Sequence, residues 1–502
     1  MVTMKLIVLL LLCCLLSSSS ADDTVVTKRR FPKNFKLGVA NAAPQIEGAW
    51  DTDGKGETIW DHFARTRPEM ISDRSTPAVA CDSYHKYKED VALVKNMGLD
   101  VYRLSIAWSR VLPTGKIDSV NQLGVQYYKK LLKELKDNNV QAMVTLYHWD
   151  LPQPLQDEYG GWLNETVVDL FVDYAKLCFE LFGDDVQWWV TINEPKQVCN
   201  AGYGDGRFAP GIVSRGIGEY VCNKNVILAH AKAYRIYDEQ YRSKQGGKVS
   251  MVIDTLWFEP SSDNPGDIDA SERLLQFGFG MFGNPIFLGD WPKLVKDRVA
   301  MRSKLEGFAV SRLPEFTQEE IKLIKGTYDY LGLNHYATHM ASAAQEAPIG
   351  EPSFGADIST YEWSKPEWTK GAGDWFSVVP WGLRKLLVWL KKNYGDVEIV
   401  ITENGLSDTT GTLEDDHRVD YFRDYISNCL DAIYEDNVNL TTYIAWSIID
   451  DWEWTGGYGS FLGMYKVDFN DPERPRIKRK SADYFTQIVK NRCLVDVKDC
   501  TD

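Results

Sequence analysis

The sequence predicts an α/β fold closed into a single (β/α)8 barrel, and three observations predict it. Helical patterns and short β-rich runs alternate along residues 31–490, eight β-rich runs occur, and no Pro-rich linker or low-complexity tract interrupts them. Strands that alternate with helices join by right-handed crossovers into a parallel sheet, and eight such units suit a closed barrel. An open, doubly wound sheet is the alternative. It is disfavoured because the first run, LGVANAAPQ, lacks a glycine-rich phosphate-binding turn.

The eight strands are expected near residues 35, 101, 141, 187, 248, 329, 397 and 442. Between them, helices are expected where apolar residues recur at helical spacing and a stop residue follows. These helices cover residues 123–136 (ended by Asn138 and Asn139), 167–182 (ended by Gly183), 317–325 (opened by a capping box of Thr317 and Glu320 and ended by Gly326), 382–394 (ended by Gly395) and 418–435.

Residues 1–20 are expected to be a secretory signal peptide, and residues 21–502 a single barrel domain. Lys5 precedes an apolar run from Leu6 to Leu16, and small residues follow it. The run is short for a membrane span, which needs about 20 apolar residues. An uncleaved anchor is the alternative. We therefore expect a secreted, extracellular protein that is not held in a membrane.

The charge balance argues against two classes of partner. The chain has 71 acidic and 56 basic residues, a formal net charge of −15. Such a surface repels phosphate backbones and anionic membranes, so neither nucleic acid nor a membrane is expected as a partner. Association of two copies into a homodimer stays open.

The cysteines and glycosylation motifs agree with the secretory route. Of nine Cys, Cys13 and Cys14 lie in the expected leader, which leaves an odd number. An oxidising route allows disulfides, for which Cys493–Cys500 and Cys199–Cys222 are candidates, with at least one thiol left over. No Cys–His spacing resembles a zinc site, and no metal is expected. N-glycosylation motifs occur at Asn164 and Asn439.

Nearly every expected strand ends on a hydrogen-bonding side chain. In a barrel, the C-terminal ends of the strands converge on one mouth, where active sites lie. These strand-end residues are Gln45, Arg103, His148 with Trp149, Asn193 with Glu194, Asn334 with Tyr336, Glu403 with Asn404, and Trp446.

Two of these residues are carboxylates at the ends of apolar strands: Glu194 in WWVTINEP and Glu403 in IVITENG. A pair about 5–5.5 Å apart supports retaining glycoside hydrolysis, whereas a wider gap admits a water and gives inversion. The sequence does not fix the gap. The structural alternative is that each Glu caps a helix or pairs with Arg103. We expect Arg103 near Glu403, where it would keep that carboxylate ionised.

Aromatic residues near the carboxylates suggest a sugar as ligand, because indole stacks on the C–H faces of a pyranose. Of 17 Trp, several lie at strand ends or in the stretch DDWEWTGGYG. Glu453, between two indoles, could accept hydrogen bonds from sugar hydroxyls. His148 could donate to a hydroxyl, or it could be a structural histidine with satisfied hydrogen bonds.

The motifs TINEP, ITENG, LYHWDLPQ, YRLSIAWSR, PQIEG and AWSIIDDWEW together resemble glycoside hydrolase family 1, the β-glucosidase family. The resemblance runs from about Phe31 to Val489 and is to a secreted, insect-like animal member. It implies a (β/α)8 (TIM) barrel and retaining hydrolysis of small-molecule β-glycosides through a covalent glycosyl-enzyme intermediate, with no metal or organic cofactor.

The resemblance also assigns roles to individual residues. Glu194 matches the acid/base and Glu403 the nucleophile. The other matches are Gln45, His148, Asn193, Glu453 and Trp454 as glycone-binding residues, Trp446 beneath the sugar ring, Asn334 and Tyr336 beside the nucleophile, and Trp375 as an aglycone-stacking residue. Arg103, Asn334 and Trp149 are expected to support the substrate-binding residues.

The sequence departs from the family pattern at five positions. Pro44 replaces a usual Tyr, Asp451 and Trp452 replace Asn and Phe, and Phe461 and Leu462 stand where a basic residue and Phe are common. These changes are expected to line the glycone side or the entrance, which leaves sugar preference open.

Two other functions stay open. One is thioglucoside hydrolysis. Plant enzymes of that type carry Gln at the position of Glu194, but an animal thioglucosidase could retain Glu. The other, less favoured, is a non-catalytic sugar-binding module.

Overall fold

The structure is a computed structural model that describes residues 26–501. The expected signal peptide over residues 1–20 lies outside the described residues. Among those described, no helix has the length and hydrophobicity needed to cross a membrane.

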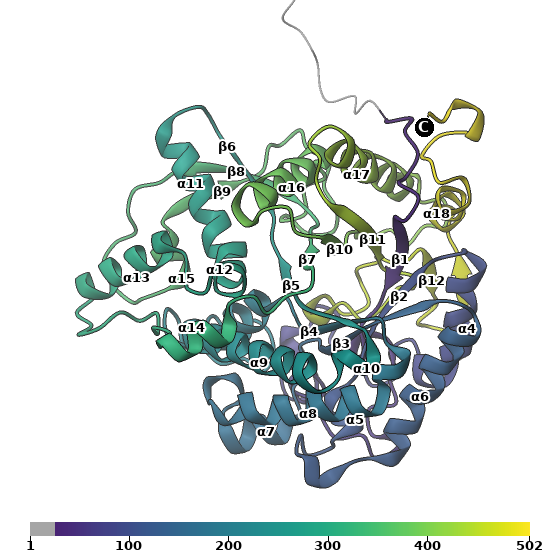
Figure 1. Ribbon diagram of the computed structural model, residues 1–502, viewed down its shortest axis with the longest axis horizontal. Helices are drawn as coiled ribbons and strands as arrows, with labels where there is room; N and C mark the ends of the chain where they lie inside the picture. Colours follow the sequence, from purple (N-terminus) through teal and green to yellow (C-terminus); the bar gives the residue numbers. More distant parts are fainter. Residues whose placement is uncertain (1–25, 502) are drawn as a thin grey trace, which may run out of the picture.

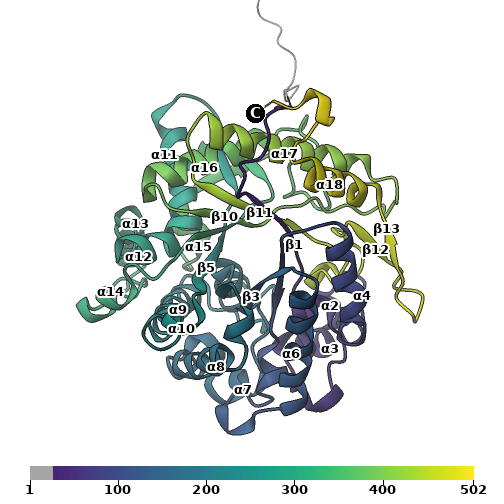
Figure 2. The same ribbon diagram turned by 45° about the vertical axis from the view of Figure 1, so that its right-hand side comes forward.

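Eight parallel strands form a closed barrel, which confirms the predicted fold class. In Figures 1 and 2 the strands surround the centre of the molecule and the helices form an outer layer around them. The order around the barrel is β1-β11-β10-β7-β5-β4-β3-β2. The strands are β1 (Lys36–Ala40), β2 (Val101–Ser105), β3 (Gln141–Tyr147), β4 (Trp188–Asn193), β5 (Lys248–Asp254), β7 (Leu331–Asn334), β10 (Ile399–Glu403) and β11 (Leu440–Trp446).

At least one helix separates each barrel strand from the next. The helices are α2 (Ala43–Ile46), α3 (Ile59–Thr66), α4 (Ser83–Asn96), α5 (Trp108–Val111), α6 (Gln122–Asp137), α7 (Gln153–Tyr159), α8 (Thr166–Phe182), α9 (Gly218–Gln240), α10 (Arg242–Gln245), α11 (Pro265–Leu275), α12 (Met281–Leu288), α13 (Lys293–Leu305), α14 (Gln318–Ile324), α15 (Phe354–Ile358), α16 (Pro380–Tyr394), α17 (Asp416–Tyr434) and α18 (Lys480–Asn491).

The start and stop signals that the sequence predicts are present at several helix ends. At the start of α14, Thr317 accepts from the backbone N–H of Glu320 and the Glu320 side chain accepts from that of Thr317. After α6, Asn139 takes a left-handed φ of 59°. After α16, Gly395 has a φ of 84°, which a residue with a side chain adopts only at a cost.

Two small sheets lie outside the barrel. β6 (Trp257–Pro260), β8 (Thr338–Ala343) and β9 (Thr360–Trp363) form one, and β12 (Tyr465–Val467) pairs with β13 (Arg476–Lys478). β6 follows β5, and β8 follows β7, so the first sheet extends the segments that leave the C-terminal ends of these strands.

The interior of the barrel is packed with apolar side chains. Met143, Val190, Val252 and Val400 from four strands belong to one buried cluster, and Trp446 belongs to the same cluster. This packing supports the residues at the mouth, so polar side chains there are held by a rigid base.

Candidate active site

A cavity of about 840 Å³ opens at the C-terminal ends of the barrel strands. Of the thirteen residues expected to be catalytic, to bind substrate or to support binding, eleven line it: Gln45, His148, Trp149, Glu194, Asn334, Tyr336, Trp375, Glu403, Trp446, Glu453 and Trp454. The other two, Arg103 and Asn193, lie behind this lining and are buried. Residues from far apart in the sequence therefore meet at one site, as the barrel predicts.

Glu194 follows the last residue of β4 and reaches the cavity through a strained backbone. Its φ is 47°, in the left-handed region that residues with a side chain rarely adopt. Its backbone N–H donates to the carbonyl of Val252 in β5 at 2.9 Å, and Pro195 follows it. Trp149 (φ 70°) and Trp454 (φ 51°) in the same cavity are left-handed as well. Such conformations gather at functional sites, where the surrounding structure holds them.

Glu403 ends β10 and is held by charged and hydroxyl donors. Arg103 Nη1 donates to Glu403 Oε1 at 2.5 Å, and the Tyr336 hydroxyl donates to Glu403 Oε2 at 2.6 Å. Both oxygens therefore accept a strong hydrogen bond, and one of these bonds is an ion pair.

The two carboxyl groups have different proton affinities. Burial, then the charges of Asp254 and Glu403, raise the pKa of Glu194 well above its usual value. Burial also raises the pKa of Glu403, but Arg103, Tyr336 and Asn334 oppose this shift. A proton shared by this site therefore resides on Glu194, while Glu403 is the carboxylate.

A chain of amide hydrogen bonds connects Arg103 to His148. Arg103 Nη2 donates to Asn193 Oδ1 at 2.7 Å, which leaves Asn193 Nδ2 to donate to His148 Nε2 at 3.1 Å. Asn334 donates to Asn193 Oδ1 at 3.1 Å and to Glu194 Oε1 at 2.7 Å. Burial and the charge of Arg103 lower the pKa of His148 well below its usual value. The neutral ring thus accepts at Nε2 and carries its proton on Nδ1.

One end of the cavity combines hydrogen-bonding groups with indole rings. Gln45 Nε2 donates to Glu453 Oε2 at 2.8 Å, whereas the buried Gln45 Oε1 has no partner among the described residues. The His148 ring lies 5.8 Å from that of Trp446 and 6.0 Å from that of Trp454, centroid to centroid. A flat, polyhydroxylated ligand suits this combination of apolar faces and polar edges.

The other end of the cavity is more open. Trp375 is 51% exposed and lines the cavity there, where the resemblance predicts an aglycone-stacking residue. Lys196 and Asp254 also line it and form an ion pair at 3.0 Å.

Asp254 is a residue that the sequence interpretation missed. It ends β5, the one barrel strand for which no strand-end candidate was named, and its charge raises the pKa of Glu194. The run KVSMVID ends on this acid just as WWVTIN precedes Glu194, so the same strand-end criterion would have found it.

The five residues that depart from the family pattern were expected to line the glycone side or the entrance of the site. Of the five, Leu462 alone lines the cavity. Asp451 and Trp452 are buried behind the lining, and Pro44 is half-buried outside it. Phe461 packs 5.9 Å from the Arg479 guanidinium, measured to the ring centroid. These four side chains can affect the site only through their neighbours.

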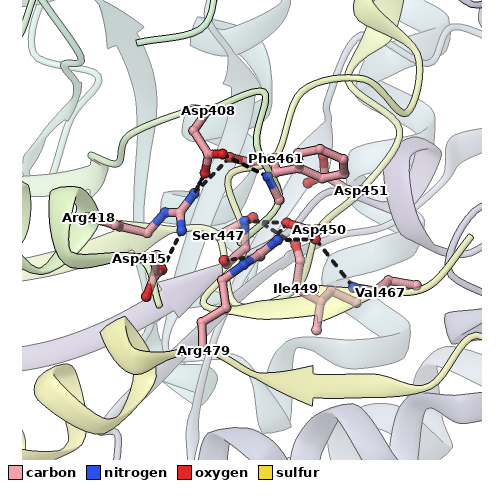
Figure 3. Close-up of polar contacts among 12 residues, drawn as sticks. Asp408, Asp415, Arg418, Ser447, Ile449, Asp450, Asp451, Phe461, Val467 and Arg479 are labelled. Atoms are coloured by element: carbon pink, nitrogen blue, oxygen red, sulfur yellow. Dashed lines mark hydrogen bonds and ion pairs between the residues drawn. The ribbon is translucent and has the colours of Figure 1, made fainter. Parts of the chain in front are cut away.

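Two buried ion-pair groups hold the segments after β10 and β11 together (Figure 3). Arg418 contacts Asp415 and donates to Asp408 Oδ2 at 2.6 Å, while Arg479 holds Asp450 through two bonds of 2.7 and 2.8 Å. The backbones of Asp408 and Phe461 exchange hydrogen bonds of 2.8 and 3.0 Å. This network fixes the segment that carries Leu462 to the segment that follows Glu403.

Both expected disulfides are present, Cys199–Cys222 and Cys493–Cys500. The first ties the short helical turn Gln197–Ala201, which begins three residues after Glu194, to α9. Cys81, Cys178 and Cys429 are buried free thiols. Across residues 26–501, no three His, Cys, Asp or Glu side chains are grouped as metal ligands would be.

The sequence model that describes glycosyl hydrolase family 1 matches residues 27–493 of this chain. The chain belongs to glycosyl hydrolase family 1. Myrosinase 1 of the aphid Brevicoryne brassicae is 44% identical over 92% of this chain and 98% of its own length. The cytosolic β-glucosidase of Cavia porcellus is 43% identical over 92% of this chain and 99% of its own length.

A solved structure of a mutant of a rice β-glucosidase in a covalent complex with Glc is also similar. Its TM-score is 0.88, with 39% identity over 94% of this chain and all of that one. Membership of family 1 makes this chain a retaining glycoside hydrolase that acts on small-molecule β-glycosides. The alternative of a non-catalytic sugar-binding module is therefore set aside.

Proposed function

We propose that the protein is a β-glucosidase-like O-glycosidase in which Glu403 is the nucleophile and Glu194 the acid/base. The observation that carries this proposal is the contrast between the two carboxyl groups. Glu403 accepts from Arg103 at 2.5 Å, whereas Glu194 accepts only the neutral Asn334 amide, at 2.7 Å, among its side-chain hydrogen bonds within residues 26–501. One group is prepared to attack and the other to hold a proton.

The reaction proceeds in two displacements. Glu403 attacks the anomeric carbon while Glu194 gives its proton to the departing glycosidic oxygen, which forms a covalent glycosyl-enzyme. Glu194, now a carboxylate, takes a proton from a water that attacks the same carbon. The sugar leaves with its original configuration, and Glu194 regains its proton.

The glycone is held at the closed end of the cavity. Gln45, Glu453 and His148 bond its hydroxyls, and Trp446 lies beneath the ring. Asn193 acts from behind the lining by fixing the His148 ring. The aglycone extends past Trp375. Support comes from the rice relative, whose structure contains covalently bound Glc.

Thioglucoside hydrolysis is the second candidate. The observation that favours it is the 44% identity to the aphid Myrosinase 1. An S-linked glucoside would use the same nucleophile, but its thiolate leaves without needing the proton of Glu194.

We also propose that residues 1–20 are a cleaved signal peptide and that residues 21–502 are a secreted single domain. The two disulfides support an oxidising compartment, although the relatives include a cytosolic enzyme. Asn439 is exposed and available to a glycan, while Asn164 is half-buried. Two copies could associate, and the size of the secreted protein in solution tests this.

The test is turnover of p-nitrophenyl β-glucoside, β-galactoside, β-fucoside and 1-thio-β-glucoside, with Glu403→Ala as control. Release from the O-glycosides that disappears in the variant supports the proposal. Faster release from the thioglucoside than from its oxygen counterpart would favour the second candidate. No release from any of the four would overturn both.

A further inference from the structure

Asp451 stands where the family pattern usually has Asn, and it lies directly behind the glycone end of the cavity. It is 1% exposed. Asn41 Nδ2 donates to its Oδ2 at 3.3 Å, and Gln45 Nε2 donates to its Oδ1 at 3.3 Å. An Asn at this position could donate a hydrogen bond at any pH, whereas an Asp donates only when it is protonated.

A single amide group, that of Gln45, contacts the carboxyl groups of both Asp451 and Glu453. Gln45 Nε2 lies 3.3 Å from Asp451 Oδ1, 2.8 Å from Glu453 Oε2 and 3.3 Å from the carbonyl of Trp452. Because both contact the same nitrogen atom, the carboxyl groups of Asp451 and Glu453 lie close to each other. One NH₂ group has two hydrogens, so it cannot give each of these three acceptors a full hydrogen bond of its own.

No cation in the described part of the chain neutralises these two acids. Within residues 26–501, no ion pair includes Asp451 or Glu453. The guanidinium of Arg479 pairs with Asp450, and that of Arg103 pairs with Glu403.

The other titratable groups facing the pair do not favour ionisation either. After burial, the charge of Asp450 raises the pKa of Asp451 and the charge of Glu403 raises the pKa of Glu453. The Cys81 thiol is buried, and burial with the charge of Arg103 lowers the pKa of His148, so neither supplies a positive charge. Two buried carboxylates this close, with no cation, cannot both be ionised without a large cost.

We propose that Asp451 is a positioning residue whose carboxyl group shares one proton with Glu453, and that the sugar binds tightly only while this proton is present. The inference rests on the proposed role of Glu453 as a glycone-binding residue. Burial, opposed in part by the hydrogen bonds from Asp451 and Gln45, raises the pKa of Glu453 to about 7, and burial with the charge of Glu453 raises that of Asp451. Loss of the proton breaks the bond that orients Glu453 and places a second negative charge behind the sugar hydroxyls.

The consequence is a separation of KM from kcat. Above the pH at which the Asp451–Glu453 pair loses its last proton, KM rises by about tenfold per pH unit, because the fully ionised pair does not bind sugar. The alkaline limb of kcat instead follows Glu194. In Asp451→Asn, the amide donates to Glu453 at every pH, so KM becomes independent of pH.

The experiment compares the wild type, Asp451→Asn and Asp150→Asn between about pH 5 and pH 9. Asp150 is a matched control because it is a second buried carboxyl with a raised pKa, of about 8, and it does not line the cavity. We expect the rise of KM in the wild type and in Asp150→Asn, and a flat KM in Asp451→Asn with its kcat profile unchanged. A wild-type rise of KM that persists in Asp451→Asn, or that disappears equally in Asp150→Asn, would overturn the inference.

A second measurement needs no variant of the pair. Calorimetric titration of the inactive Glu403→Ala enzyme with glucose, in buffers of different ionisation enthalpy, counts the protons taken up on binding. We expect about one proton above the titration of the pair and none below it. Binding without proton uptake both above and below the titration of the pair would contradict the inference, but it would not contradict the proposed function. A Glu403→Ala enzyme that still turns over β-glucoside would instead contradict the proposed function.

Discussion

Arg103 Nη1 lies 2.5 Å from Glu403 Oε1, whereas no cation among residues 26–501 forms an ion pair with Glu194. Both acids are buried, at 3% and 8% exposure respectively, so burial alone does not distinguish them. The difference comes from their partners, which are a guanidinium and a phenol for Glu403 and an amide for Glu194. Two glutamates at equivalent strand ends thereby acquire different protonation states.

We expect Glu194→Gln to lose activity in a manner that depends on the leaving group. Release of a phenol with an ordinary pKa should fall by about 10²–10⁴-fold, while 2,4-dinitrophenol, which leaves without a proton, should be affected far less. Added azide should restore turnover and give a β-glycosyl azide, because the anion needs no base. An equal loss with both leaving groups would argue against Glu194 as the acid.

We expect Asp254→Asn to move the alkaline limb of kcat/KM to lower pH. The charge of Asp254 raises the pKa of Glu194, so without it Glu194 loses its proton at a lower pH. Lys196→Met is the matched variant of opposite sign, because Lys196 lowers that pKa. A pH–rate profile of each variant checks this, and shifts in the same direction for both would contradict it.

The barrel was predictable because its signals are local. All eight strands were expected near their observed positions. Helical periodicity, stop residues and apolar runs can each be recognised within a short stretch of sequence, without knowledge of distant contacts. The convergence of Glu194 and Glu403 on one mouth then followed from barrel topology.

What could not be predicted depends on contacts between distant segments. The sequence placed Asn193 among the strand-end residues, but only the fold shows it behind the lining, where it orients His148. Phe461 and Leu462 are neighbours in sequence, yet one packs on Arg479 and the other lines the cavity. Sequence position does not say which of two adjacent side chains faces the ligand.

We expect the double variant Cys199→Ser/Cys222→Ser to lose stability and activity together. The disulfide closes a loop of 23 residues, and its loss should cost about 3 kcal/mol in the free energy of unfolding. It also frees the turn beside Glu194. Cys493→Ser/Cys500→Ser, with a loop of 7 residues near the C-terminus, should cost about 2 kcal/mol and leave kcat/KM unchanged. Urea unfolding and kinetics of both variants test this, and equal kinetic losses would count against it.

We expect Asp408→Asn to destabilise the protein by about 3 kcal/mol at neutral pH, because it breaks a buried ion pair with Arg418 (Figure 3). Burial would raise the pKa of Asp408, but bonds from His417 and Thr410 and the charge of Arg418 lower it overall. A depressed pKa stabilises the fold above the unfolded value of about 4, and the stabilisation is lost as pH falls below it.

The destabilisation by Asp408→Asn should therefore shrink towards pH about 2. Asp137→Asn, which removes an exposed i,i+4 pair with Lys133, should change stability by less than about 0.5 kcal/mol at any pH. Unfolding free energies measured as a function of pH decide between these results, and a constant difference for Asp408→Asn would refute the account of its charge.

The most direct test of the site is to trap the nucleophile with a 2-deoxy-2-fluoro-β-glucoside that carries a good leaving group. The fluorine slows hydrolysis of the glycosyl-enzyme more than its formation, so the covalent intermediate accumulates. We predict one fluorosugar per enzyme, attached to the peptide that contains Glu403, and no label in Glu403→Gln. A label on Glu194 or Glu453, or an enzyme that turns over β-glucosides but never becomes labelled, would contradict the assignment of Glu403 as the nucleophile.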